Sequence, residues 1–172
     1  VGVVNGFSGC PGSGPGDKKP NWVTCAWPPD YLEILDWQWN EVVLPYWSKM
    51  NTELGNAGVK FAFEMHPGFV VYNTDTMLRV RRECGDNIGA NFDPSHLFWQ
   101  GMEPVECVKA LKGCIYHVHA KDSIVHQTNA AVNGVNDFIT FLNQVLLERM
   151  QILFAVPRAA ARRAQAFHDF QQ

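Results

Sequence analysis

The sequence lacks the features that mark several common classes of protein. No apolar run approaches the roughly 20 residues that a membrane-spanning helix needs, and the first residues lack the basic segment of a secretory signal peptide. The five cysteines are odd in number and include no CxxC pair, which argues against a disulfide framework and against a zinc knuckle. These absences predict a cytoplasmic protein without a membrane partner.

Basic residues are too few to predict a nucleic-acid partner. Lys and Arg number 14 against 17 Asp and Glu, and the formal net charge is -3. Such a balance supplies no broad positive surface for phosphate groups. The glycine-rich run GCPGSGPG at 9–16 lacks the GK[ST] ending of a phosphate-binding loop, so it predicts an ordinary loop.

Apolar strands and amphipathic helices alternate along most of the chain. Such alternation is typical of βαβ units, and it predicts an α/β fold with a parallel sheet. Asp30, followed three residues later by Glu33, predicts a capping box at the start of a long helix, and Pro45 predicts a kink in it. The predicted strands lie at 1–6, 59–66, 87–93 and 114–122, and the predicted helices at 30–55, 73–84 and 104–112.

Ionisable residues stand near the C-terminal end of each later strand. Because side chains alternate across a strand, Glu64 shares the face opposite Phe61 and Phe63, and Asp93 shares the face opposite Phe92. In the last strand, the same alternation places four residues on one face: Ile115, His117, His119 and Lys121. Parallel strands bring these side chains to one edge of the sheet, where barrel enzymes carry their active sites.

Two carboxylates and several histidines at one edge predict a divalent metal site. A buried carboxylate is costly without hydrogen bonds, a counter-ion or a metal. Mixed oxygen and imidazole ligands suit Mn, Zn, Co or Mg and do not select among them. Taken singly, Glu64 or Asp93 could equally be a structural carboxylate that caps a loop amide. His66 and His117 are expected to support the ligands by hydrogen bonds rather than to bind the metal.

Three motifs, FEMHPGF, NFDPSHLFWQG and HVHAKD, resemble the sugar phosphate isomerase/epimerase family, whose xylose isomerase-like TIM barrels share a fold with AP endonuclease type 2 proteins. The resemblance covers 1–135 and implies an incomplete (β/α)8 TIM barrel, strands four to seven with their helices, followed by a divergent tail at 136–172. A complete barrel typically needs about 250 residues. The resemblance implies that Glu64, Asp93 and His119 bind the metal, with manganese among the candidate ions. It also makes Glu64 the catalytic acid/base and places His96 and Lys121 at the substrate.

The activity implied by the resemblance is isomerisation or epimerisation of a sugar or polyol, by proton transfer at a metal-chelated carbonyl. Family members carry a further glutamate, both ligand and second acid/base, in a segment of the type IEHED that this sequence lacks, so activity is expected to be impaired. A shifted reading frame after about Val135 would explain the loss. Two alternatives stay open: a metal-dependent phosphodiesterase of the AP-endonuclease type, and an inactive fragment whose open sheet edges would promote homo-oligomers or aggregates. The substrate and the metal are not determined by the sequence.

Overall fold

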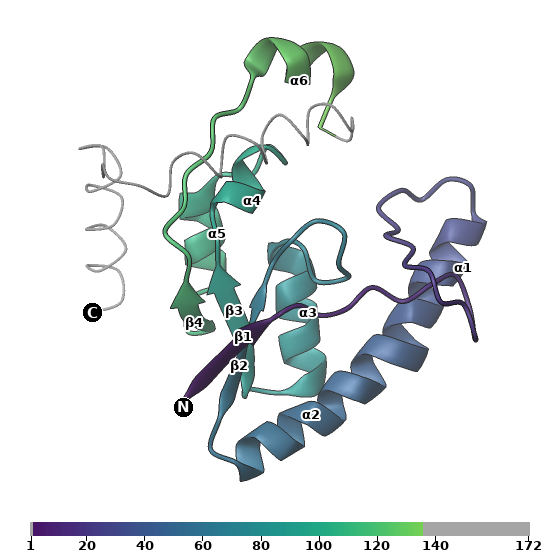
Figure 1. Ribbon diagram of the computed structural model, residues 1–172, viewed down its shortest axis with the longest axis vertical. Helices are drawn as coiled ribbons and strands as arrows, with labels where there is room; N and C mark the ends of the chain where they lie inside the picture. Colours follow the sequence, from purple (N-terminus) through teal and green to yellow (C-terminus); the bar gives the residue numbers. More distant parts are fainter. Residues whose placement is uncertain (1, 136–172) are drawn as a thin grey trace.

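The computed structural model describes residues 2–135, which form one parallel sheet with helices on its outer face (Figure 1). Its strands, in spatial order, are β1 (Val3–Gly6), β2 (Lys60–Glu64), β3 (Ile88–Phe92) and β4 (Ile115–Val118). Its helices are α1 (Asp30–Trp37), the π-helix η1 (Gln38–Val43), α2 (Leu44–Asn56), α3 (Thr74–Cys84), α4 (Ser95–Phe98), α5 (Pro104–Ala110) and α6 (Gln127–Asn133). The divergent tail predicted at 136–172 lies outside the described residues.

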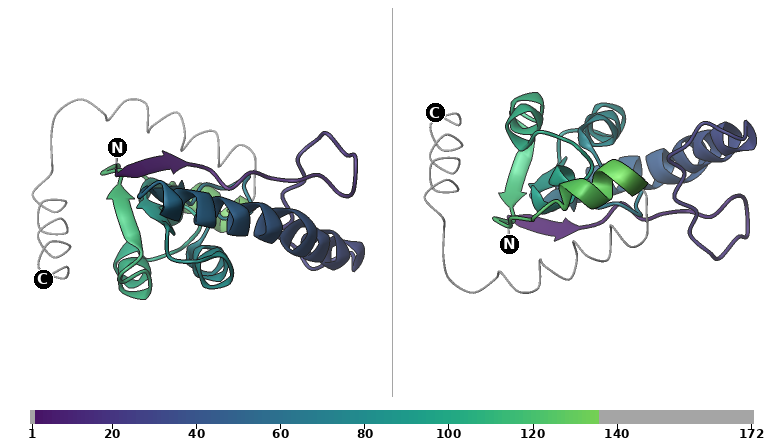
Figure 2. Two further views of the ribbon diagram at one scale, coloured as in Figure 1. Left: turned by 90° about the horizontal axis from the view of Figure 1, so that it is seen from below. Right: turned by 90° about the horizontal axis from the view of Figure 1, so that it is seen from above.

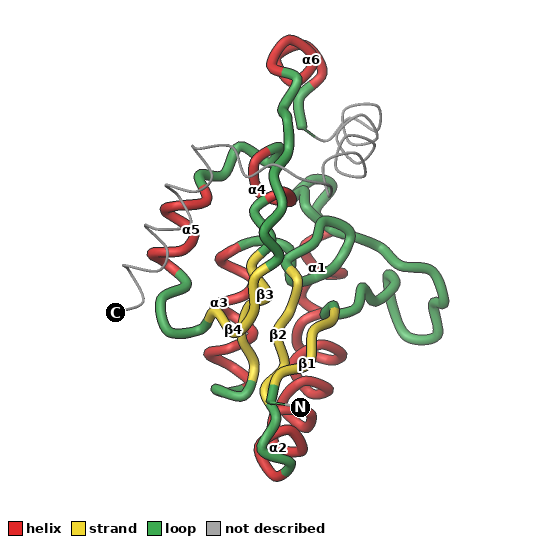
Figure 3. The backbone as a smooth tube through the Cα atoms, turned by 60° about the vertical axis from the view of Figure 1, so that its left-hand side comes forward, coloured by secondary structure: helices red, strands yellow, loops and turns green. Residues whose placement is uncertain are grey.

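The four strands form a curled half-barrel, which confirms the predicted α/β class and the incomplete TIM barrel. Each strand pairs in parallel with the next strand in the chain, through crossovers that carry the helices. Residues of the outer strands β1 and β4 come within 8 Å of each other between Cα atoms, so the sheet has a concave inner face. Figures 2 and 3 show helices α2 and α3 on the opposite, convex side. The concave face is therefore free to hold polar side chains.

The long helical segment before β2 is continuous but changes its hydrogen-bonding pattern. The α1 helix passes into the π-helix η1, and α2 then begins with Pro45 in its first turn. Proline lacks an N–H and fits the first turn of a helix, so the irregular turn falls just before it. The predicted capping box is wrong, because Pro29 precedes the helix and no side chain caps it.

Helix α3 begins and ends where its sequence directs. The side chain of Asn73 accepts a hydrogen bond from the backbone N–H of Thr76, whose hydroxyl accepts one from the backbone N–H of Asn73. This reciprocal pair satisfies two backbone donors at the first turn. Gly85 follows the helix with a φ of 126°, a conformation that favours glycine. The boundaries of α3 fix where β3 starts.

The hydrophobic core lies between the convex face of the sheet and the helices. Trp47 of α2 packs its ring against Phe61 and Phe63 of β2, with ring centroids 4.9 and 4.4 Å apart. Each such aromatic side chain buries a large apolar area, which is the main stabilising contribution. Further buried core members are Trp39, Val43, Met65, Met77, Val80, Ile88, Ala90, Phe92 and Leu97. The predicted outward face of β2 is thereby confirmed.

An irregularity in β4 corrects one prediction about its faces. Ala90 pairs with Ile115, but the next residue of β3, Asn91, pairs with His117, so β4 carries one extra residue. This bulge reverses the alternation, and Ile115 packs with the core instead of sharing the inner face with His117. Gly89 allows the chain before β4 to approach closely, because an added Cβ would collide with the Cys114 carbonyl oxygen and the Tyr116 ring.

No helix within 2–135 is long and apolar enough to cross a membrane. All five cysteines, which lie in this part of the chain, are free thiols.

Candidate metal centre

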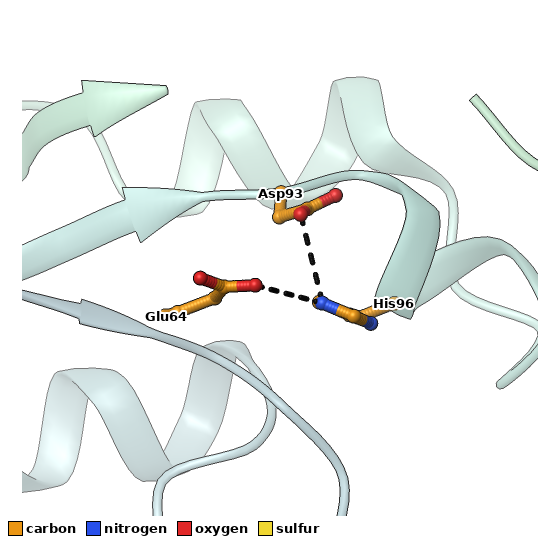
Figure 4. Close-up of side chains that lie close together, drawn as sticks. All are labelled: Glu64, Asp93 and His96. Carbon is orange, nitrogen blue, oxygen red and sulfur yellow. Dashed lines mark hydrogen bonds and ion pairs between the residues drawn. The ribbon is translucent and has the colours of Figure 1, made fainter. Parts of the chain in front are cut away.

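Three side chains from neighbouring elements converge at the C-terminal end of the sheet (Figure 4). Glu64 ends β2, Asp93 directly follows β3, and His96 lies in α4. One ligand atom from each lies within 4.8 Å of the others, and the side chains are 12%, 0% and 7% exposed. Atoms bound to one divalent ion at about 2.0 to 2.2 Å are at most about 4.4 Å apart, so this group is close to the size that a single ion requires.

Asp93 divides its two oxygens between structure and site. Its Oδ1 accepts hydrogen bonds from the backbone N–H of Ser95 at 3.0 Å and from the Ser95 hydroxyl at 2.6 Å. Its Oδ2 is buried, forms no hydrogen bond of good geometry with the described residues, and lies 2.5 Å from the Lys121 Nζ atom. A buried carboxylate oxygen needs a cation, which Lys121 supplies here and which a metal ion could supply in its place. Oδ1 of Asp93 therefore has a structural role in the turn, and Oδ2 is the atom that could bind a metal.

His119 and Lys121 also reach the two carboxylates. The Nδ1 atom of His119 lies 3.2 Å from Glu64 Oε2 and 3.6 Å from Asp93 Oδ2. The Nζ atom of Lys121 lies 2.5 Å from Asp93 Oδ2 and 3.7 Å from Glu64 Oε1. The bulge leaves His119 and Lys121 on the inner face. All five residues singled out in the sequence are thus brought together, although the compact group contains His96 in place of His119.

The charges around Glu64 keep it ionised. Burial raises the pKa of Glu64, but a hydrogen bond from His96 and the charges of Lys121, His96 and His119 outweigh this effect and hold the pKa at about 2. The Nε2 atom of His96 lies 2.9 Å from Glu64 Oε1. At neutral pH Glu64 is therefore a carboxylate that can bind a cation or accept a proton.

Asn91 is a further member of the site, and the sequence motifs assigned it no role. Its side chain is fully buried, and its Oδ1 lies 2.9 Å from His117 Nδ1. Its Nδ2 lies 3.5 Å from Glu64 Oε2 and 3.3 Å from the ring nitrogens of His119. The available signal was its position, two residues before Asp93 on an otherwise apolar strand.

An aromatic wall borders the carboxylates on the β1 side. The ring of His66 lies 4.2 Å from that of His96, and Phe7 stacks on Phe69 with ring centroids 4.5 Å apart. Burial, and then the charge of His96, lower the pKa of His66. Its Nδ1 lies 2.6 Å from the Pro67 carbonyl oxygen, so His66 belongs to the wall and not to the compact group.

The donor set fits a divalent cation. It combines two carboxylates with imidazole nitrogens, and its buried Asp93 Oδ2 faces cationic groups rather than a hydrogen-bond donor of the backbone. Carboxylate and imidazole together suit Mn, Zn or Co, with Mg favouring the oxygens. Residues 2–135 could therefore hold a metal through Glu64, Asp93 and a histidine.

The parallel, helix-covered sheet with its charged residues at the C-terminal ends of the strands is the arrangement of a TIM barrel. The sequence matches the family described as xylose isomerase-like TIM barrel over residues 3–150. The chain belongs to this family, which confirms the resemblance drawn from its motifs.

Two curated proteins are similar to this chain. It is 43% identical over 132 residues to YfiH of Bacillus subtilis (strain 168), an uncharacterized protein, covering 75% of this chain and 42% of that protein. It is 34% identical over 101 residues to the rhizopine catabolism protein MocC of Rhizobium meliloti, covering 58% of this chain and 29% of that protein. The chain thus spans less than half the length of both relatives.

Two solved structures are also similar. A D-tagatose 3-epimerase-like protein gives a TM-score of 0.47 at 19% identity, covering 98% of this chain and 62% of that chain. A xylose isomerase domain protein from Planctomyces limnophilus gives a TM-score of 0.39 at 21% identity, covering 60% of this chain and 34% of that chain.

Proposed function

We propose that this chain carries the metal-binding part of an isomerase or epimerase that moves a proton within a small sugar or polyol. The observation that carries the proposal is the convergence of Glu64 and Asp93 with His96 and His119 at the C-terminal ends of neighbouring strands. Membership in the xylose isomerase-like family supports the reaction class. The similarity to a protein of rhizopine catabolism supports a catabolic role.

Glu64, Asp93 and His119 are the proposed ligands. Each stands at the end of a strand, and His119 Nδ1 faces an oxygen of both carboxylates. When bound, the divalent ion would polarise the substrate carbonyl and acidify the adjacent C–H. His96 and Lys121 would contact the substrate oxygens, with His96 as the rival candidate for the third ligand position.

Glu64 is the proposed proton acceptor. Its pKa of about 2 keeps it ionised, and its side chain is 12% exposed, so one oxygen remains reachable from the concave face. The hydrogen bond from His96 Nε2 to Oε1 fixes the carboxylate plane. A proton taken from the carbon beside the carbonyl would be returned to a neighbouring atom for isomerisation. Return from the opposite face, which epimerisation requires, needs a second acid/base outside this group.

The proposal is tested by exchange of substrate hydrogen with solvent. The protein as its gene encodes it, supplied with Mn²⁺, is incubated in D2O with a panel of ketohexoses and cyclic polyol ketones. We expect deuterium at the carbon next to the carbonyl, and Glu64→Gln should abolish its incorporation. Glu106→Gln is the matched control, because Glu106 is 66% exposed and pairs with Lys109 on the surface of α5.

Two other outcomes would redirect the assignment. Cleavage of DNA at abasic sites, together with two or three metal ions per chain, would favour the phosphodiesterase alternative. Bound metal without exchange in any substrate of the panel would favour an inactive fragment. Cytoplasmic location and homo-oligomer formation stay predictions from the cysteine count and the open sheet edges.

A further inference from the structure

Asn91 contacts three residues of the site at once: Glu64, His117 and His119. It is fully buried on the inner face of β3, between β2 and β4. Its amide reaches Glu64 on one side and His117 and His119 on the other. A buried amide must satisfy both its donor and its acceptor, so its orientation fixes the groups around it.

The chemistry of the neighbours allows one orientation of this amide. Glu64 is ionised and accepts hydrogen bonds only, so the NH2 group must face its Oε2 and the carbonyl oxygen must face away. The atom opposite that carbonyl oxygen is His117 Nδ1, at 2.9 Å. His117 must therefore carry a proton on Nδ1. The orientation of the Asn91 amide thus couples His117 to Glu64.

We infer that Asn91 is a positioning residue, which holds the Glu64 carboxylate and the His119 ring in place and is itself held by His117. This inference rests on the metal site proposed above. His117 contributes through Asn91, because its Nδ1 contacts Asn91 Oδ1 and not a carboxylate of the compact group. The bulge in β4 makes the arrangement geometrically available, since it sets His117 opposite Asn91.

The test measures the Mn²⁺ affinity of the full-length protein by titration calorimetry. Asn91→Leu keeps the side-chain size but removes the amide, and His117→Phe removes the anchor at an exposed position. Losing a hydrogen-bond partner of a metal ligand typically weakens metal binding about 10- to 100-fold, and we expect this for each variant. Because both act through one chain of contacts, the double variant should weaken binding no more than Asn91→Leu alone.

A matched control comes from the same strand region. Asn87 precedes β3, and its amide bonds the backbone of Asn51 on the convex side, away from the carboxylates. Asn87→Leu should lower stability without changing Mn²⁺ affinity.

A second measurement is ¹⁵N NMR of the metal-free protein. His117 should carry its proton on Nδ1 in the unmodified protein, and Asn91→Leu should shift His117 toward the Nε2 tautomer. A purely structural role of Asn91 would leave the tautomer of His117 unchanged.

The outcomes separate this inference from the proposed function. If the unmodified protein binds no divalent metal, the proposed site fails, while the NMR tautomer of His117 still tests the amide orientation. If it binds Mn²⁺ and Asn91→Leu binds it equally well, the positioning role is wrong. Fully additive losses in the double variant would also overturn it, because His117 would then act independently of Asn91.

Discussion

Replacing Asp93 by Asn is the sharpest perturbation of the metal centre. The two side chains have the same shape, and an Asn oxygen can still accept the hydrogen bonds from the Ser95 backbone N–H and hydroxyl. The local turn should therefore persist. The change removes one of the two negative charges and replaces the buried Oδ2, whose neighbour is the Lys121 Nζ atom at 2.5 Å, by an amide group. An amide NH2 cannot bind a cation.

The expected effect is the loss of metal-linked stability. A ligand present at 100 times its dissociation constant stabilises the folded state by about 2.7 kcal/mol. For a chain of this size class, each kcal/mol raises Tm by roughly 2 to 4 °C, so Mn²⁺ should raise the Tm of the unmodified protein by roughly 5 to 10 °C. With Asp93→Asn the increase should vanish, because only one carboxylate remains to neutralise the ion.

Differential scanning calorimetry with and without Mn²⁺ measures the Tm of each variant and the increase in Tm that the metal causes. Asp86→Asn is the control, because Asp86 is 90% exposed and pairs with Arg81 away from the site. It should retain the full increase in Tm. A metal-induced increase that survives Asp93→Asn, or that disappears equally in Asp86→Asn, would show that Asp93 is not a ligand.

Three further predictions concern neighbouring residues. His119→Ala should weaken Mn²⁺ binding in calorimetry by more than about 100-fold and His96→Ala by about 10- to 100-fold, whereas the reverse order would make His96 the third ligand. Lys121→Met should tighten Mn²⁺ binding by on the order of tenfold, because it removes a cation 2.5 Å from Asp93 Oδ2. Unchanged affinity would show that Lys121 does not compete with the metal. Gly89→Ala should lower the free energy of unfolding in urea by about 1 to 3 kcal/mol, because its Cβ would meet the Cys114 carbonyl oxygen and the Tyr116 ring, and a neutral result would indicate that these neighbours can shift.

The order of strands and helices was predictable because each unit carries its own local signals. The alternation in β2 placed Glu64 opposite Phe61 and Phe63, and the structure agrees, since the rings of both phenylalanines pack on Trp47. The predicted helix at 73–84 matches α3, which Gly85 follows with a φ of 126°. These features depend on residues close in sequence, so a single sequence contains them.

Features that depend on neighbouring strands were not predictable. The bulge opposite Ala90 and Asn91 is a property of two paired strands, and nothing within 114–122 alone indicates that Ile115 turns to the core. The pairing of Asn91 with His117 follows from that bulge. The helix starts at Asp30 as predicted, but the capping box was wrong, because the residue at the cap position is Pro29 and no side chain caps the helix.

Metal binding and turnover make different demands on this barrel. The candidate ligands lie between Glu64 and His119, on adjacent strands whose pairing is local, so their geometry requires only β2, β3 and β4. Proton return from the opposite face of a substrate instead requires a group across the barrel, which the described strands do not supply. Under the proposed function, a chain limited to these strands would bind a metal ion and still fail to epimerise. Measuring affinity and turnover separately therefore distinguishes a damaged ligand set from an incomplete barrel.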